Sequence, residues 1–290
     1  MRSAQSKDLR FEIFDLYNET RTQDPAPWPL APLRMELMRR IAFFGGSFDP
    51  PHRGHLAIAT AAADLFALDQ VLFAPAGHQP FKGKTPATEF LHRYTMTALA
   101  TEADPRFIPS LLDAPHRKAI DATRPNYTVE TLAHLRASLS TETEPTQLFT
   151  LVGADSWLEI GHWYQAPRLL ALSDWIVAGR PGFSLADAPA AFPPEVKVEP
   201  GSSDIAPANH ASGSLPACHL TLHHAGSAPT RVWFLPDLKE DISATELRAA
   251  LELGNPDPAL LPASVWNYIA KTKIYRSSID CSSDPVARRP

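Results

Sequence analysis

Two histidines, His52 and His55, are the residues of this 290-residue chain whose type and spacing best suit chemistry. They stand three positions apart, after a glycine-rich turn and at the expected start of a helix. Each imidazole can donate a hydrogen bond to a phosphate oxygen, and the helix dipole favours an anion at the same place. A helix end with two surface histidines is one alternative. A two-histidine metal site is another, for which this spacing alone is weak support.

A second set of polar residues lies at the start of another expected helix and consists of Ser243, Thr245 and Arg248. Ser or Thr at such a position ordinarily caps the helix. The same hydroxyl can also donate to a phosphate that shares the helix terminus, and Arg248 would lie one turn away from that anion. Both roles fit the sequence.

The segment Gly77–Thr85 is close to a phosphate-binding P-loop, because it follows an expected strand and ends in Gly-Lys-Thr. Five residues separate its glycines where a P-loop has four, and Pro80 removes one backbone N–H group that would hold a phosphate. A P-loop nucleotide hydrolase that acts through Lys84 is therefore a rival interpretation.

Two further positions have a structural and a functional interpretation each. Asp155 follows one expected strand and precedes a helix, so it can cap that helix or hold ribose hydroxyls. Trp163 and Tyr164 can be core aromatics, or they can hold a flat heteroaromatic ring.

Short apolar runs alternate with helical patterns, which indicates a parallel sheet with helices on both faces. The first unit is a strand, a helix with apolar residues at helical spacing from Leu56 to Phe66, and a second strand. Further helices are expected at Glu89–Glu102 and Val129–Ser138. The expected strands are Ile41–Phe44, Val71–Ala74, Leu148–Val152, Trp175–Ala178 and Val232–Leu235.

The segments that follow these five strands are rich in glycine, small hydroxyls, cations and histidine. In an open parallel sheet, ligands bind beyond the carboxyl ends of the strands. Backbone N–H groups, hydroxyls and positive charge therefore gather at one edge, which suits a phosphate-rich ligand.

Composition and charge exclude other classes of protein. The net charge of −5 argues against a general nucleic-acid binder, and no apolar run approaches the roughly 18 residues that span a bilayer. The N-terminus lacks the apolar stretch of a signal peptide, and the only cysteines, Cys218 and Cys281, lie far apart. We expect a cytoplasmic protein with no nucleic-acid or membrane partner.

One domain is expected, at residues 40–276, between a flexible extension at 1–39 and a flexible tail at 277–290. Proline supplies 29 of the 290 residues, and many of them fall outside the expected sheet and helices. An insertion at about 184–230 is expected to be mostly irregular, with a short strand near Val196 or Leu220. Solvated surface, and not a metal site, is expected for its histidines, which are His210, His219, His223 and His224.

Five motifs, in this order along the chain, resemble the HxGH nucleotidyltransferase superfamily and, within it, the bacterial nicotinate-nucleotide adenylyltransferases. The resemblance runs from about Arg40 to Arg276 and includes the ending from Leu261. The motifs are Gly45–His55, Arg124–Thr128, Gly153–Ser156 followed by Trp163-Tyr164, Gly179–Gly182 and Ile242–Arg248.

The resemblance implies a single-domain, Rossmann-like, doubly wound parallel sheet. It also implies transfer of AMP from ATP to nicotinate mononucleotide, giving deamido-NAD and pyrophosphate in NAD biosynthesis. Mg²⁺ would be carried by ATP, without dedicated protein ligands. The nucleophile would be the phosphate of the acceptor, which is largely ionised at neutral pH because its second pKa is about 6. A homo-oligomer is left open.

The resemblance also assigns residues. Catalytic roles fall to His52, His55 and Arg248. ATP-binding positions are Gly45, Gly46, Ser47, Phe48, His55, Gly153, Asp155, Arg180, Ser243, Thr245 and Arg248. Positions for nicotinate mononucleotide are Ser47, Lys82, Tyr127, Thr128, Trp163 and Tyr164.

One departure from the family is local: Gln79–Lys82 stands where the family often has Pro-Pro-His-Lys, so any role of that histidine is absent. The acceptor could instead be nicotinamide mononucleotide or pantetheine phosphate, although the aromatic residues favour a flat acceptor. A nucleotide-binding protein without turnover is the alternative from another class.

Overall fold

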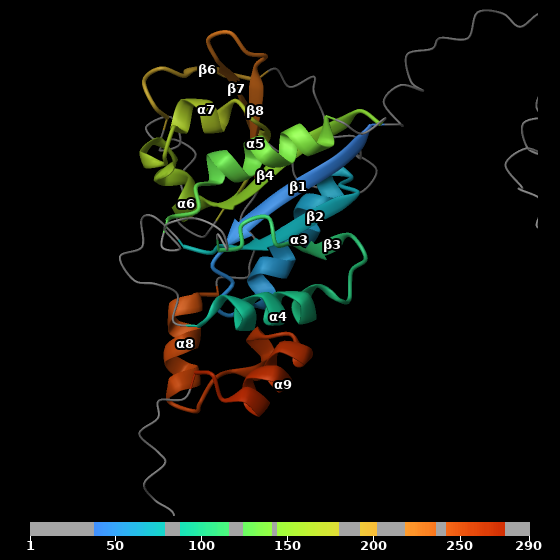
Figure 1. Cartoon of the computed structure of the whole chain (residues 1–290), viewed down its shortest axis with the longest axis vertical. Coiled ribbons are helices and arrows are strands. Elements are labelled where there is room, and N and C mark those ends of the chain that lie inside the picture. Colours follow the sequence, from blue (N-terminus) through green and yellow to red (C-terminus); the bar gives the residue numbers. More distant parts are fainter. Residues whose placement is uncertain are drawn as a thin grey trace, which may run out of the picture. The chain divides into compact units, whose positions relative to one another are not determined.

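Strands and helices alternate along the part of the chain that the structure describes (Figure 1). This structure, a computed structural model, describes residues 38–78, 88–115, 124–140, 144–179, 192–201, 218–235 and 242–275. The strands are β1 (Arg39–Gly46), β2 (Gln70–Pro75), β3 (Phe107–Pro109), β4 (Thr146–Gly153), β5 (Asp174–Ala178), β6 (Lys197–Pro200), β7 (Cys218–His223) and β8 (Thr230–Leu235). The helices are α3 (Arg53–Phe66), α4 (Phe90–Thr101), α5 (Thr128–Leu139), α6 (Ala154–Leu158), α7 (Ala166–Leu170), α8 (Ala244–Glu252) and α9 (Ala263–Thr272), with 3₁₀ turns η1 (Ile160–His162) and η3 (Pro258–Leu260).

All eight strands belong to one sheet, in the spatial order β3-β2-β1-β4-β5-β8-β7-β6. The six strands from β3 to β8 are parallel, and β7 and β6 extend the sheet in antiparallel fashion. The chain adds strands on one side of β1 first and on the other side later, so the order reverses between β1 and β4. The doubly wound parallel sheet expected from the sequence is confirmed.

Residues of the central strands alternate between two hydrophobic layers, one on each face of the sheet. In β1, Phe43 belongs to a cluster that includes residues of α5, α6 and α7, whereas its neighbours Ala42 and Phe44 belong to a cluster with α3. In β5, Trp175 and Ile176 divide in the same way. Helices therefore cover both faces, which explains why the strands are continuously apolar in the sequence.

A third hydrophobic cluster joins α4 to α8 and α9, and Figure 1 shows these three helices together at the lower end. Its members repeat at helical spacing on each helix, for example Met96 and Ala100 on α4 and Val265 and Ile269 on α9. Through this cluster the last described part of the chain packs on α4, which also contacts β2 and β3.

The five expected strands and the expected helices are confirmed, with ends that differ by at most three residues. The short elements β3 and α7 are absent from the sequence-based expectation, whereas the helix expected beside Asp155 is present as α6. A strand of three residues, and a helix of five, are too short to show a period in the sequence.

The segment at about 184–230 is more regular than expected in its described parts. Strands form near both Val196 and Leu220, and not at only one of them, because β6 and β7 pair with each other and β7 pairs with β8. The buried side chains of Val196 and Leu222 join the cluster beneath α5 and α7.

Solvated surface is the wrong interpretation for His219. It lies directly opposite Trp233 in the β7–β8 pairing, with ring centres 4.5 Å apart, and is 7% exposed. The neighbouring His223 and His224 are partly buried and approach Glu199 and Thr230, respectively. His210 lies outside the described residues.

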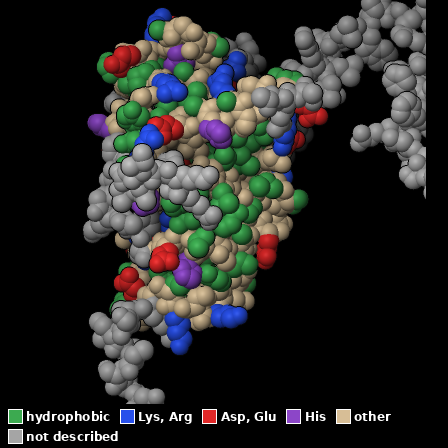
Figure 2. Space-filling model, in the orientation of Figure 1, with side chains coloured by type: hydrophobic (Ala, Val, Ile, Leu, Met, Phe, Trp, Pro, Cys, Tyr) green, Lys and Arg blue, Asp and Glu red, His purple; other side chains and the backbone are tan. Residues whose placement is uncertain are grey.

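No helix in the described residues is long and apolar enough to span a membrane. On the face shown in Figure 2, basic and acidic side chains lie near one another at the upper and lower ends, with hydrophobic side chains between them. A surface of mixed sign is what the modest net charge of −5 predicts.

Candidate active site

The carboxyl ends of the parallel strands meet at one edge of the sheet, and the predicted site residues come from the segments that leave this edge. Gly46 ends β1 beside Pro75 of β2, and Gly153 ends β4 beside Ala178 of β5. Because β1 and β4 are neighbours and the strand order reverses between them, the segments after these two strands lie at the place where open α/β sheets bind ligands.

The segment after β1 leads into α3, whose N-cap residue is His52. The backbone N–H of His52 donates to Nδ1 of His55 at 3.2 Å, and the centres of the two rings are 3.7 Å apart. Because Nδ1 accepts this hydrogen bond, a neutral His55 carries its proton on Nε2. The Nε2 atom of a neutral His55 is therefore a donor, and it lies at the positive end of α3.

An aromatic floor supports His55. Phe48 is 1% exposed and has a φ of 46°, and its ring centre lies 5.0 Å from that of His55 and 5.4 Å from that of Phe44. A Cβ atom on Gly46 would lie 3.2 Å from the Phe48 ring, so a larger residue here would push this ring out of its present position. The Phe48 ring thus fixes His55 and offers no surface of its own to ATP.

Arg248 reaches the same loop from α8, 199 positions further along the chain than Asp49. Its Nη1 donates to the backbone carbonyl of Asp49 at 2.8 Å, and its Nη2 donates to Oγ1 of Thr245 at 3.3 Å. Ser243 caps α8, since its Oγ accepts from the N–H of Glu246 at 3.3 Å, so the capping role is confirmed. The fold therefore brings the second set of predicted phosphate-binding residues to the loop between β1 and α3, which is called the histidine loop below.

Arg93, a buried cation on α4, is a site residue that the sequence analysis did not identify. It is 2% exposed and donates to the carbonyls of Ser47 at 2.7 Å, Ala76 at 2.8 Å and Thr88 at 3.0 Å. Burial lowers the pKa of Arg93, and the nearby charge of Asp49 counteracts part of this effect. Arg93 thus joins the loops after β1 and β2. Its signal in the sequence is a charged residue on the apolar face of the expected helix.

Asn126 joins the loop after β2 to the start of α5. Its Oδ1 accepts from the backbone N–H of His78 at 3.1 Å, and its Nδ2 donates to the carbonyl of Ala114 at 3.0 Å. A Cβ atom on Gly77 would lie 2.5 Å from Oδ1 of Asn126 and 2.8 Å from the backbone nitrogen of Pro115. This close approach requires glycine at position 77 and fixes the residue after Asn126, which caps α5.

That residue, Tyr127, meets one of the other predicted acceptor-binding aromatics. Its ring centre lies 4.2 Å from that of Tyr164, which is 45% exposed, and Thr128 is the first residue of α5. Three predicted acceptor residues therefore lie near the N-terminus of one helix.

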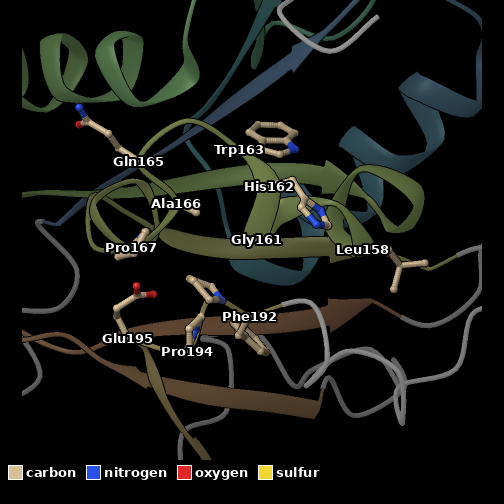
Figure 3. Close-up of a pocket in the computed structure, with 11 residues that line it drawn as sticks. Leu158, Gly161, His162, Trp163, Gln165, Ala166, Pro167, Phe192, Pro194 and Glu195 are labelled. Carbon is tan, nitrogen blue, oxygen red and sulfur yellow. The ribbon is translucent and has the colours of Figure 1, made fainter.

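Trp163 has a different environment from Tyr164. Its side chain packs against the hydrophobic cluster beneath α5 and lines an open pocket of about 480 Å³. Figure 3 shows the lining residues between Leu158 and Pro167 on one side of this pocket and Phe192, Pro194 and Glu195 on the other.

The end of β4 leaves open space. Gly153 caps α6, and among the described residues other than its two chain neighbours no atom lies within 4 Å of the position that its Cβ would occupy. Asp155 is exposed in the first turn of α6, so the interpretation of Asp155 as the N-cap is wrong. A ligand at this edge has room to approach both residues.

Lys82 and Arg180, and Lys84 of the rival P-loop, lie outside the described residues. Within the described ranges, no three His, Cys, Asp or Glu side chains are grouped so as to hold a metal ion.

Comparison with known proteins identifies the family. Residues 43–250 match the model of the cytidylyltransferase-like family. A relative from Chromobacterium violaceum, named a probable nicotinate-nucleotide adenylyltransferase, is 36% identical over 237 residues, which cover 82% of this chain and 99% of the relative. The chain belongs to the nicotinate-nucleotide adenylyltransferase family. A relative of the same name from Salinispora arenicola is 34% identical and covers 80% of this chain and 99% of its own length.

Among solved structures, the nicotinic acid mononucleotide adenylyltransferase of Plasmodium falciparum, in complex with NaAD, has a similar fold. The TM-score is 0.55 at 18% identity, with 82% of this chain and 97% of that chain covered. The family and the fold that the five motifs of a nicotinate-nucleotide adenylyltransferase imply are confirmed.

Proposed function

We propose that this protein transfers AMP from ATP to nicotinate mononucleotide, forming deamido-NAD and pyrophosphate in NAD biosynthesis. The observation that carries the proposal is the meeting of His52, His55 and Arg248 at one loop, at the point where the strand order reverses. Two imidazoles and a guanidinium at a helix N-terminus suit the α- and β-phosphates of a nucleotide. The family to which the chain belongs supports this choice of reaction.

The reaction needs no base from the protein. An oxygen of the acceptor phosphate attacks the α-phosphorus of ATP, and the bond from that phosphorus to the oxygen bridging to the β-phosphate breaks. The electron pair of the broken bond leaves with pyrophosphate. The attacking phosphate is already largely ionised at neutral pH, so catalysis consists of aligning two polyanions and stabilising the charge on the α-phosphate and the leaving group.

In this reaction we assign a stabilising role to the Nε2–H of His55 and the guanidinium of Arg248. Both groups stabilise the negative charge that develops on the phosphates. His52 acts beside them at the start of α3. Additional phosphate contacts are assigned to hydroxyl and backbone N–H groups. The residues that supply them are Gly45, Gly46, Ser47, Ser243 and Thr245, together with the backbone of Phe48. Adenosine is assigned to Gly153, Asp155 and Arg180. Mg²⁺ enters with ATP as part of the substrate.

The acceptor site is assigned to Ser47, Lys82, Tyr127, Thr128, Trp163 and Tyr164. The meeting of Tyr127 and Tyr164 beside the N-terminus of α5 supports a flat ring that carries a negative group. Hydrogen bonds from free N–H groups to a carboxylate contribute about 1.5–3 kcal/mol, which corresponds to a preference of about 10-fold to 100-fold for nicotinate over the neutral nicotinamide.

The experiment that tests the proposal measures pyrophosphate release from ATP with each acceptor in turn. Nicotinate mononucleotide should give deamido-NAD with a kcat/KM at least about 10-fold above that for nicotinamide mononucleotide. Pantetheine phosphate should give no product.

Each other result selects an alternative. Equal kcat/KM for the two mononucleotides would refute the acceptor assignment, and no release with any acceptor would favour a binding protein without turnover. ATP hydrolysis without acceptor, lost on Lys84→Ala, would favour the P-loop interpretation. We assign the activity to the domain expected at residues 40–276 and place it in the cytoplasm.

A further inference from the structure

The ending of the chain, which carries one of the sequence resemblances, has no part in the chemistry proposed above. Lys273, with a φ of 57°, ends α9, and the chain then turns toward the histidine loop. There the hydroxyl of Tyr275 donates to Oδ1 of Asp49 at 2.6 Å, across 226 positions of sequence. The two side chains are 5% and 1% exposed. A buried tyrosine thus contacts the residue that stands three positions before His52.

Asp49 links several parts of the site. Its Oδ2 accepts from the backbone N–H of Thr88 at 3.3 Å, and its carbonyl accepts from Arg248 at 2.8 Å. The carboxylate also lies near the buried charge of Arg93. Asp49 therefore contacts the segment before α4, the predicted phosphate-binding arginine of α8 and the C-terminal tyrosine.

The hydroxyl of Tyr275 is a fixed donor in its hydrogen bond to Asp49. Burial, and then the charge of Asp49, raise the pKa of the Tyr275 hydroxyl well above its usual value. The phenol therefore keeps its proton at neutral pH, and in its contact with the Asp49 carboxylate it is the donor.

We infer that Tyr275 is a positioning residue for adenylyl transfer: it holds Asp49, and through Asp49 it sets the loop that carries His52 and His55 and the guanidinium of Arg248. This inference rests on the proposed function. Reacting groups must be held in a narrow geometry, and a misplacement of about 1 Å can lower a rate by about 100-fold. Loss of the Tyr275 hydroxyl should therefore affect the transition state more than ground-state binding of ATP.

The test compares Tyr275→Phe with a matched control, Tyr268→Phe. Tyr268 belongs to the same helix cluster, and its hydroxyl hydrogen-bonds to Nδ1 of His92 at 2.7 Å. Tyr275→Phe should lower kcat at least about 10-fold with KM for ATP changed less than about 3-fold, whereas Tyr268→Phe should keep kcat within about 2-fold of the wild type. Rates are expressed per folded molecule, from single-turnover amplitudes.

A double-mutant cycle separates positioning from general stability. If Tyr275 acts through Asp49, then adding Tyr275→Phe to Asp49→Asn should lower kcat by less than about 2-fold more. Full additivity of the two losses would overturn the inference, as would a Tyr275→Phe enzyme with wild-type kcat. If Tyr275→Phe does not fold, Asp49→Asn alone decides, since an unchanged kcat in that variant would also overturn it. Wild-type deamido-NAD formation is measured first, so a failure of the proposed function is recognised separately.

Discussion

A histidine donates to a phosphate only when its proton sits on the nitrogen that faces the ligand. In this protein the backbone N–H of His52 occupies Nδ1 of His55, so the proton of the neutral ring sits on Nε2. The rings of Phe44 and Phe48 pack against the ring of His55 and limit its movement. The local structure thus prepares His55 as a donor before any ligand binds.

The replacement His55→Ala should lower kcat by at least about 100-fold, because the lost donor acts mainly on charge that develops in the transition state. The melting temperature should change little, since the ring is only half-buried. Steady-state kinetics with ATP and nicotinate mononucleotide measure the effect. The control is His134→Ala, which removes an exposed histidine of α5 and should leave kcat unchanged. Near-normal turnover in His55→Ala would contradict the assigned role.

Elements differ in how much space they leave at the carboxyl edge of the sheet. The loop after β2 is closed, because Gly77 touches Asn126 and Pro115. The end of β4 is open in the described part of the chain, because no residue there except the two chain neighbours of Gly153 lies within 4 Å of its Cβ position. The open end is where the adenosine of ATP is proposed to bind, and this contrast can be tested with a single methyl group.

Gly153→Ala should raise KM for ATP at least about 5-fold, because the added methyl occupies space proposed for the ligand, and this corresponds to about 1 kcal/mol. The free energy of unfolding should change by less than about 0.5 kcal/mol, since φ at this position is −76° and the methyl would lie within 4 Å of no described residue beyond its chain neighbours. Kinetics and urea unfolding measure the two effects. Glu159→Ala, at an exposed position after α6, should change neither value. An unchanged KM in Gly153→Ala would place adenosine elsewhere.

At the scale of elements, the sequence predicts what a long apolar run or a helical period encodes. The five expected strands, from Ile41–Phe44 to Val232–Leu235, are predicted in this way. An apolar run predicts a strand but does not say which strand it pairs with, so the pairing of β7 with β8 could not be predicted. This pairing places the ring of His219 on that of Trp233 and buries it. The composition of the segment alone therefore predicts a solvated side chain for His219.

For the whole molecule, the fold is what assembles the site. Arg248 and Tyr275 reach Asp49 across 199 and 226 positions, and no local pattern encodes either contact. The motifs predict which residues belong to the site, but they do not predict that Arg93 joins the loops on which these residues lie. In the described residues, Arg93 donates its hydrogen bonds to backbone carbonyls, and a carbonyl acceptor does not require a particular residue type that the sequence could reveal.

The stability of the whole molecule should fall as the pH drops below the ordinary histidine pKa of 6.5. Burial, and then the charge of Arg231, lower the pKa of His219 in the folded state. Burial, and then His223, lower the pKa of His224. The unfolded chain therefore binds protons at a higher pH than the folded chain, so acid favours unfolding.

His219→Phe keeps a ring against Trp233 and removes one of these proton-binding groups. Urea unfolding at pH 7.5 and pH 5.5 should show a smaller loss of stability in the variant than in the wild type. An equal loss in both proteins would show that His219 does not contribute to the pH dependence.

The central claim is that the carboxyl edge of the sheet positions two substrates for a direct transfer, with the acceptor phosphate as the only nucleophile. The most direct measurement uses ATP with sulfur at the α-phosphorus in one known configuration, and determines the configuration at that phosphorus in the deamido-NAD analogue formed. A single in-line displacement predicts inversion. Retention would mean two successive displacements through an adenylylated side chain, and would contradict the account.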